Sequence, residues 1–512
     1  MCVRMWRHIV ARCGQAGFAL VEFQRRALPG QWIIMIIATT VVLVWAFTKP
    51  IVFTQDTFTY MEHARELQLG KSSDPDYPRL PVFPAILWAS KVTDLKHSVS
   101  PLIIFHSVLA IAACGLFHAA ARRVGPRGAF AVSLVFIVSL LPFMHVKHIM
   151  TEQSFLFETI FALYGLVWYL TARTTREARK AIAVLGAGVA LMMLTRPQGS
   201  YVLPVLFGIV AVLVWRRALT ALIGAVLVVA AVWAVQTGDK IRIGSQNSAG
   251  SFESSHTTGA MLLFSLYLDG IRANIHISPE NGPRSAELEA LLLDELAKPD
   301  TLARRSSAYL SSVPPKDVPA FVEKSFREPN SDFWMMLGFT ALKERLGPKE
   351  ADKLLVDVCL EAVRAYPMET AWLFLDKGVQ TYFDPLMLAV PTHDPFPEGS
   401  FQPPLSKQID AAGDFTNPTS FDRAVDDNLR WLMRSAIVLA IVTLPVALFY
   451  RTWRVTIALL IFGLYLNFAV VVGNTALFRY VIYAIPVNLL CAYVGVVALV
   501  STLWVRYQRK PP

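Results

Sequence analysis

Long uncharged apolar runs and short polar turns alternate along the chain, in two groups separated by a long polar segment. A helix needs about 20 apolar residues to cross the roughly 30 Å hydrocarbon core of a bilayer. The pattern therefore predicts an all-α polytopic membrane protein with about ten transmembrane helices, at 31–48, 101–121, 128–145, 150–171, 180–195, 201–216, 218–236, 433–450, 455–473 and 479–503.

The basic residues indicate the orientation of these spans, because Lys and Arg near the ends of a span resist translocation. With a cytoplasmic N-terminus, the inner segments hold 19 basic residues and only two acidic ones, Glu22 and Glu177. We therefore expect a multi-pass protein of the inner or plasma membrane with both termini in the cytoplasm. The segment 237–430 is then extracytoplasmic, on the periplasmic side in a bacterium.

Charge divides in the same way. The predicted outer segment has 19 Lys or Arg and 28 Asp or Glu, a net charge of −9, whereas the rest of the chain carries +19. The overall charge of +10 thus reflects membrane topology, and no zinc-finger or helix-turn-helix pattern indicates nucleic acid. Five regions are predicted: a basic cytoplasmic or interfacial lead (1–30), seven spans with an outer loop at 49–100 (31–236), an extracytoplasmic domain (237–430), three spans (431–505) and a basic cytoplasmic tail (506–512).

The extracytoplasmic domain is predicted to be mainly helical. Its apolar periodicity favours helices at 286–297, 318–326, 333–345, 348–365 and 369–383. Cys359 is its single cysteine, so it cannot contain an internal disulfide. No group of metal ligands with a recognisable spacing occurs, so we expect no cofactor, and a divalent metal is not indicated but stays open.

The first predicted outer loop carries chemistry close to the membrane. Thr54 or Asp56 would cap a helix that runs through Leu67, and on that helix Asp56, Tyr60 and His63 share one face. A carboxylate at a membrane boundary indicates a functional site. A role for Asp56 as a simple helix cap stays open as the alternative.

Other outer turns add charged residues. Cations there run against the positive-inside preference and suit a phosphate held at headgroup depth, although snorkelling also explains an interfacial arginine. Glu152 opens the fourth span after His145 and His148, where an acid also complements the helix dipole. The four outer cations are Arg79, Lys147, Arg196 and Arg479.

The order of these motifs resembles the GT-C superfamily of membrane glycosyltransferases, which includes protein O-mannosyltransferases and the lipid A aminoarabinose transferase. Seven spans precede the large outer segment, as in that superfamily. The matching motifs are Gln55-Asp56-Thr57 with Tyr60, Tyr77-Pro78-Arg79-Leu80-Pro81, Thr151-Glu152-Gln153, Thr195-Arg196-Pro197 and Phe478-Arg479-Tyr480.

The resemblance implies a GT-C-like bundle that binds membrane lipids and a polyprenyl-phosphate sugar. The sugar would pass, with inversion, to a hydroxyl or amine of a glycan, lipid or protein acceptor. Asp56 would be the catalytic base, and Glu152 would orient the acceptor or the donor sugar. Arg79, with Lys147, Arg196 or Arg479, would bind the donor phosphate. Candidate substrate-binding residues are Tyr60, His63, His145 and His148.

The sequence departs from the family pattern in two ways. A single Asp56 replaces the paired acids of some members, which argues against a tightly held divalent metal, and the outer domain matches no unit of that superfamily. Two alternatives stay open: a flippase or transporter of lipid-linked glycans, and an oligosaccharide ligase or polymerase with a similar layout. The spans carry almost no charge and the charged groups gather at one face, which favours an interfacial enzyme over a transporter.

Overall fold

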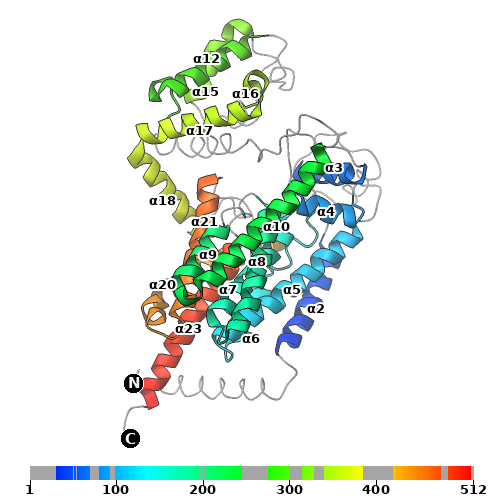
Figure 1. Ribbon diagram of the computed structural model, residues 1–512, viewed down its shortest axis with the longest axis vertical. Helices are drawn as coiled ribbons and strands as arrows, with labels where there is room; N and C mark the ends of the chain where they lie inside the picture. Colours follow the sequence, from blue (N-terminus) through cyan, green and yellow to red (C-terminus); the bar gives the residue numbers. More distant parts are fainter. Residues whose placement is uncertain are drawn as a thin grey trace.

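The computed structural model describes residues 30–49, 51–52, 55–69, 80–92, 99–196, 199, 202–244, 275–298, 314–327, 339–383, 419–473 and 482–508. Within these ranges the regular elements are helices, and the extended pairing is one isolated bridge between Val52 and His148. The chain is thus all-α, as predicted, with a helical bundle below and a smaller group of helices above it (Figure 1).

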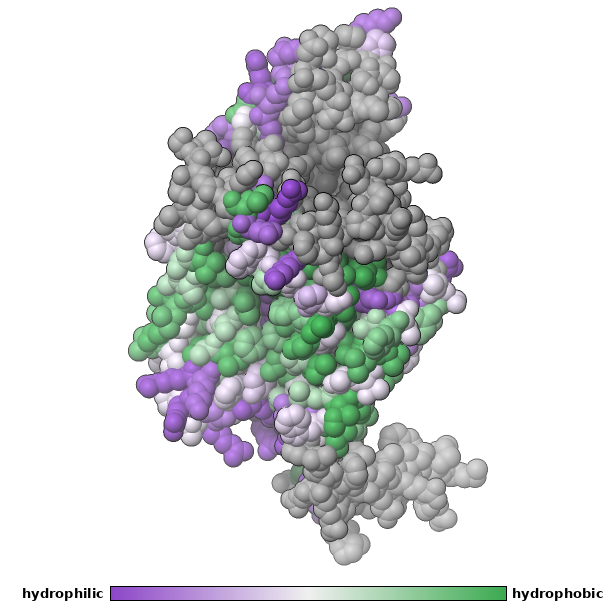
Figure 2. All heavy atoms as spheres, turned by 90° about the vertical axis from the view of Figure 1, so that its right-hand side faces the viewer, coloured by the Kyte–Doolittle hydropathy of each residue, from purple (hydrophilic) through white to green (hydrophobic). Residues whose placement is uncertain are grey.

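The helical bundle contains the predicted spans. Among the described residues, seven helices are long and apolar enough to cross a membrane, and further apolar helical segments lie in α6, α9 and the first part of α21, Trp453–Asn467. On the face seen in Figure 2, hydrophobic residues form a band across the bundle, with hydrophilic residues below and above it. The bundle helices are α2 (Gly30–Thr48), α5 (Ser100–Val124), α6 (Ala129–Val138), α7 (Glu152–Thr171), α8 (Thr175–Thr195), α9 (Val202–Leu213), α10 (Ala218–Gly244), α20 (Ser420–Leu448), α21 (Trp453–Gly473) and α23 (Ala484–Gln508).

Two short helices follow α2 at the end of the bundle that the basic residues predict to be outer, which is called the outer end below. They are α3 (Gln55–Leu69) and α4 (Val82–Ala89), and they pack against each other. The helix predicted from Thr54 or Asp56 is therefore confirmed. Because α3 begins at Gln55, Asp56 lies in its first turn.

The third predicted span is shorter than its apolar run. Helix α6 ends at Val138, Leu140 adopts a left-handed backbone with φ 61°, and residues 141–147 form turns. Pro142 disfavours helical backbone just before it, and Leu141, Phe143 and Val146 are buried although they are not helical. The prediction of a helix through 145 was therefore wrong, because apolar character alone does not separate a buried turn from a span.

Helices α7 and α8 form the centre of the bundle and approach each other closely. A Cβ atom on Gly165 would lie 2.5 Å from the backbone nitrogen of Leu185, and one on Gly188 would lie 2.7 Å from that of Ala162. Small residues at a helix crossing let the backbones come together and maximise van der Waals contact. This packing fixes the two helix ends at which Glu152 and Arg196 lie.

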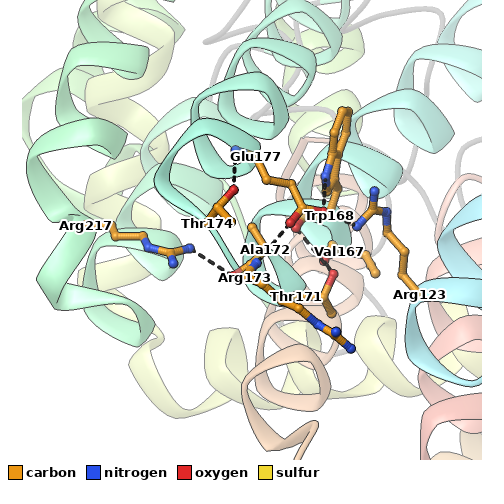
Figure 3. Close-up of polar contacts among 9 residues, drawn as sticks. All are labelled: Arg123, Val167, Trp168, Thr171, Ala172, Arg173, Thr174, Glu177 and Arg217. Atoms are coloured by element: carbon orange, nitrogen blue, oxygen red, sulfur yellow. Dashed lines mark hydrogen bonds and ion pairs between the residues drawn. The ribbon is translucent and has the colours of Figure 1, made fainter.

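The opposite end of α7 and α8 is joined by a polar turn (Figure 3). Oε1 of Glu177 accepts hydrogen bonds of 3.0 Å from Arg123 Nη1 and Trp168 Nε1, and Oε2 accepts one of 3.0 Å from the backbone N–H of Arg173. The backbone N–H of Glu177 in turn donates to Thr174, the N-cap of α8. One of the two acids predicted for the inner turns thus joins α5, α7 and α8.

The upper group of helices is built around its own apolar core. It contains α12 (Pro283–Ala297), α15 (Val318–Arg327), α16 (Phe339–Leu346) and α17 (Pro348–Ala365), and α18 (Pro367–Phe383) leads from α17 toward the bundle (Figure 1). Four of the five predicted outer helices are present close to their predicted bounds. The prediction at 333–345 falls partly outside the described residues, and its described part is α16.

A buried glutamate connects two helices of this core. Glu361 of α17 accepts hydrogen bonds at the N-terminus of α12 from the backbone N–H groups of Arg284, at 3.0 Å, and Ser285, at 2.8 Å. The hydroxyl of Ser285 donates to it as well, at 2.7 Å. Burial opposes ionisation of Glu361, but these hydrogen bonds outweigh burial and lower its pKa. Glu361 therefore caps α12 from another helix.

Candidate functional site

The start of α3 is fastened to the segment between α6 and α7. The backbone N–H of Val52 donates to the carbonyl of Lys147 at 2.9 Å, and that of Ile149 donates to the carbonyl of Val52 at 3.2 Å. Within α3, the hydroxyl of Thr57 donates to the carbonyl of Ile149 at 3.1 Å. Residues separated by about 90 positions are thereby brought together at the outer end.

Asp56 lies in the helical turn that this contact fixes. It immediately precedes Thr57, so its backbone lies beside residues 147–149. Its side chain lies outside the described part of the structure. The catalytic role of Asp56 therefore stays a prediction, now with a defined backbone position.

Glu152 and Arg196 form a buried ion pair at the outer ends of α7 and α8. Nη2 of Arg196 lies 2.5 Å from Oε1 of Glu152, and the two side chains are only 8% and 1% exposed. Nε of Arg196 also donates to the hydroxyl of Thr151 at 2.6 Å. Two residues from separate predicted outer turns thus meet, because Glu152 begins α7 and Arg196 ends α8.

Aromatic rings enclose the guanidinium of Arg196. Its central carbon lies 5.7 Å from the ring centre of Phe155 and 5.5 Å from that of Tyr483, and these two rings meet edge to face. A desolvated cation above such rings gains from their negative faces. Phe155 and Tyr483 are not predicted from the sequence, and no local signal marks Tyr483, which lies 287 positions beyond Arg196.

Of the predicted histidines, His148 lies near the oxygen of Glu152 that Arg196 does not contact, and His145 lies against His148. Nδ1 of His148 is 4.0 Å from Oε2 of Glu152, and Nδ1 of His145 is 3.4 Å from Nδ1 of His148. Both rings are buried and stacked. Within the described ranges, no group of three or more His, Cys, Asp or Glu residues is arranged to hold a metal ion.

Lys147 points back toward α2. Its ammonium donates to the carbonyl of Ala46 at 2.9 Å and to that of Lys49, at the C-terminal end of α2. Partial burial lowers its pKa. In this conformation Lys147 satisfies helix carbonyls, so a contact with a donor phosphate would require those bonds to be exchanged.

Tyr60 packs at the contact between α3 and α4. Its ring meets the ring of Phe83 edge to face at 5.1 Å, and Phe83 stacks on His106 of α5. Tyr60 is 7% exposed, whereas His63 is half-buried. Their predicted substrate contacts stay predictions, and the packing of Tyr60 shows that it also positions α3.

A second carboxylate lies deeper in α7 behind the ion pair. Glu158 is buried, and its Oε1 accepts a hydrogen bond of 2.7 Å from the hydroxyl of Thr195. Thr195 directly precedes Arg196, so two consecutive residues at the end of α8 bind the two acidic residues of α7, Glu158 and Glu152. The remaining predicted phosphate ligands, Arg79 and Arg479, lie outside the described residues.

No protein-family model and no curated protein matches the chain. Among solved structures, the chain is similar to ArnT from Cupriavidus metallidurans bound to undecaprenyl phosphate. The identity is 14%, with 95% of this chain and 82% of that chain covered, at a TM-score of 0.35. The apo structure of the same protein gives 14% identity, 91% and 77% coverage, and a TM-score of 0.33.

ArnT is a lipid A aminoarabinose transferase, one of the groups that the motifs of this sequence resemble. Both TM-scores are below 0.5, so this likeness carries no argument about function.

Proposed function

We propose that this protein is a membrane glycosyltransferase of the GT-C type that uses a polyprenyl-phosphate-linked sugar. The sugar passes to a hydroxyl or amine of a glycan, lipid or protein acceptor at the outer face of the membrane. The observation that carries the proposal is the contact between Thr57 and Ile149, which places the start of α3, with Asp56, beside the segment that leads into Glu152. Motifs that the sequence separates widely thus converge at one end of a membrane-type bundle.

In the proposed reaction, Asp56 accepts the proton of the acceptor group while the acceptor oxygen or nitrogen attacks the anomeric carbon. The bond from that carbon to the phosphate oxygen breaks, and polyprenyl phosphate leaves with the developing negative charge. A base near the anomeric carbon and cations near the leaving group would stabilise this transition state. A single displacement of this kind inverts the anomeric configuration.

Glu152 and Arg196 have linked roles in this proposal. The guanidinium fixes one oxygen of Glu152 and leaves the carboxylate at the helix end, where it orients a sugar or acceptor hydroxyl. Because Arg196 is already paired with Glu152, it assists phosphate binding only from the edge of this ion pair. Arg79 is the proposed principal phosphate ligand, with Lys147 or Arg479 assisting, and the proposal requires no metal, because a single Asp56 stands in place of the paired acids.

The deciding experiment measures transfer of radiolabelled sugar from a native membrane lipid extract to endogenous acceptors. Wild type is compared with Asp56→Asn, which keeps the shape of the side chain and removes its basicity. We expect transfer to fall by at least 100-fold, within the range that general-base catalysis contributes. The control is Arg65→Gln, a charge-removing change at an exposed position of the same helix, which should retain transfer.

Each protein is also tested for binding of the lipid-linked donor and for an unchanged thermal unfolding midpoint. Retained transfer by Asp56→Asn would refute the catalytic role and leave Asp56 as a helix-terminal residue. If neither protein transferred sugar, but wild type moved lipid-linked sugar across a liposome bilayer, the flippase alternative would replace this proposal.

A further inference from the structure

Helix α18 exposes large apolar residues and buries a lysine and two threonines, the reverse of a soluble helix, while Asp376 beside the apolar residues is exposed. Five large apolar residues at helical spacing lie on its solvent-accessible face, including Met368 at 65% and Trp372 at 63% exposure. A contiguous exposed apolar face of this kind marks an interaction surface. The five residues, called the α18 stripe below, are Met368, Trp372, Leu375, Val379 and Phe383.

The opposite face of α18 is buried and largely polar. Thr370, Lys377 and Thr381 are each no more than 3% exposed, and Leu373 lies among them. A water-facing helix would place its lysine and threonines outward and its large apolar side chains inward. The reversal indicates that the medium facing the α18 stripe is itself apolar.

The C-terminal end of α18 is fixed at a known level of the bundle. Nε of Arg434 on α20 donates to the carbonyl of Phe383 at 2.5 Å. After Arg434, α20 carries no Asp, Glu, Lys or Arg through its last residue, so this is where its uncharged membrane run begins. Trp431, one turn earlier and 69% exposed, fits the aromatic belt of a membrane interface.

The α18 stripe also continues an established apolar surface. Helix α18 packs against α20 and α21, both of which belong to the bundle (Figure 1). The uncharged run of α20 exposes Val438, Leu439, Ile441 and Val442. The C-terminal end of the α18 stripe lies beside Arg434, where the uncharged run of α20 begins. The stripe and this run therefore meet the same medium.

We propose that the α18 stripe lies in the boundary between headgroups and acyl chains of the outer leaflet. Lipid tails are then the occupant of this face, and α18 acts as an interfacial anchor for the helices α12, α15, α16 and α17. Interfacial helices bury an apolar face about 5–10 Å into this boundary. The anchor would set the height of these helices above the outer end of the bundle, independently of the reaction catalysed there.

The test places a nitroxide spin label on the α18 stripe in lipid nanodiscs of phosphatidylethanolamine and phosphatidylglycerol. Labels are attached in Val379→Cys and, separately, Leu375→Cys, with Lys353→Cys on the exposed polar face of α17 as the matched control. Cys2 and Cys13 are replaced by serine. The buried Cys114, Cys359 and Cys491 stay in place, and the parent chain gives their background labelling.

Collision with oxygen, which concentrates in lipid, is compared with collision with a water-soluble nickel complex. We expect the oxygen-to-nickel ratio at 375 and 379 to exceed that at 353 several-fold. Equal ratios at the three positions would mean that water faces α18, and inaccessibility to both reagents at 375 and 379 would mean that protein covers the stripe. Either result would overturn the proposal, and the two independent label sites guard against one variant that fails to fold.

Discussion

At the scale of single residues, the buried pair of Glu152 and Arg196 is the strongest electrostatic feature of the site. Removing one partner from such a pair leaves an uncompensated buried charge, which costs about 3–5 kcal/mol. We therefore expect Arg196→Met to lower the thermal unfolding midpoint markedly in detergent. The double variant Glu152→Gln with Arg196→Met should recover part of that loss, because neither charge is then left alone.

A double-mutant cycle on the unfolding midpoints checks this coupling. If Arg196→Met and Glu152→Gln each unfolded at the wild-type temperature, the pair would contribute nothing to stability. Simple addition of the two single effects would likewise contradict the expected coupling.

Glu361 gives a prediction of pH dependence at the same scale. Its folded-state pKa lies below its ordinary value, so its contribution is present above the unfolded-state pKa and is lost as pH falls through the folded-state pKa. At pH 7, Glu361→Gln should lower the free energy of local opening at the N-terminus of α12 by about 1–2 kcal/mol, the contribution of a helix cap. Wild type and variant should converge as pH falls through this lowered folded-state pKa.

Hydrogen exchange at the first turn of α12, corrected for intrinsic exchange rates at each pH, measures this difference. Glu280→Gln, at an exposed position before the same helix, is the control and should show wild-type protection. A difference between Glu361→Gln and wild type that stayed constant with pH would rule out the ionised cap.

At the scale of elements, the crossing of α7 and α8 decides whether Glu152 and Arg196 can meet. Gly165→Ala adds a Cβ that would lie 2.5 Å from the backbone of Leu185, so the two helices must separate. Overpacking of this kind costs about 1–3 kcal/mol. We expect a lower unfolding midpoint and, because the helix ends move, reduced sugar transfer by the folded fraction.

Gly208→Ala in α9 is the matched control, because a Cβ there has no neighbour within 4 Å. That variant should unfold at or slightly above the wild-type midpoint, since alanine favours a helix over glycine. Equal midpoints for Gly165→Ala and Gly208→Ala would show that the close crossing is not required.

At the scale of the whole molecule, an ion pair helps to join the first and last groups of spans. Nζ of Lys49, after α2, lies 2.5 Å from Oδ1 of Asp422 at the start of α20, and it sits above the rings of Trp45 and Phe421. A hydrogen bond to a charged group contributes about 1.5–3 kcal/mol. Lys49→Gln should destabilise the protein by about this amount, while the capping box of Thr419 and Asp422 stays intact.

Unfolding midpoints in detergent, with the exposed Lys180→Gln as control, measure the effect. If Lys49→Gln and Lys180→Gln shifted the midpoint equally, the contact between Lys49 and Asp422 would contribute no more to stability than an exposed surface residue.

Prediction from sequence succeeded where one signal is sufficient. Apolar run length located the bundle helices, and periodicity with an N1 proline located α17, whose stripe from Ala351 to Ala362 is buried. It failed for residues 139–145, where the apolar run continues but Leu140 and Pro142 end the helix. It also gave no indication that Lys147 would turn to the carbonyls of α2, because that choice depends on a helix end about 100 positions away.

The sequence by itself determined that this is a helical membrane-type protein whose charged groups lie near the helix ends, since hydrophobicity and charge act locally along the chain. Only the tertiary structure decided which of these groups meet. Thr57 reaches Ile149, Glu152 pairs with Arg196, and Tyr483 covers that pair, because helix crossings and turns bring distant residues within a few ångströms. Contacts of that range depend on packing, which no local pattern of residues encodes.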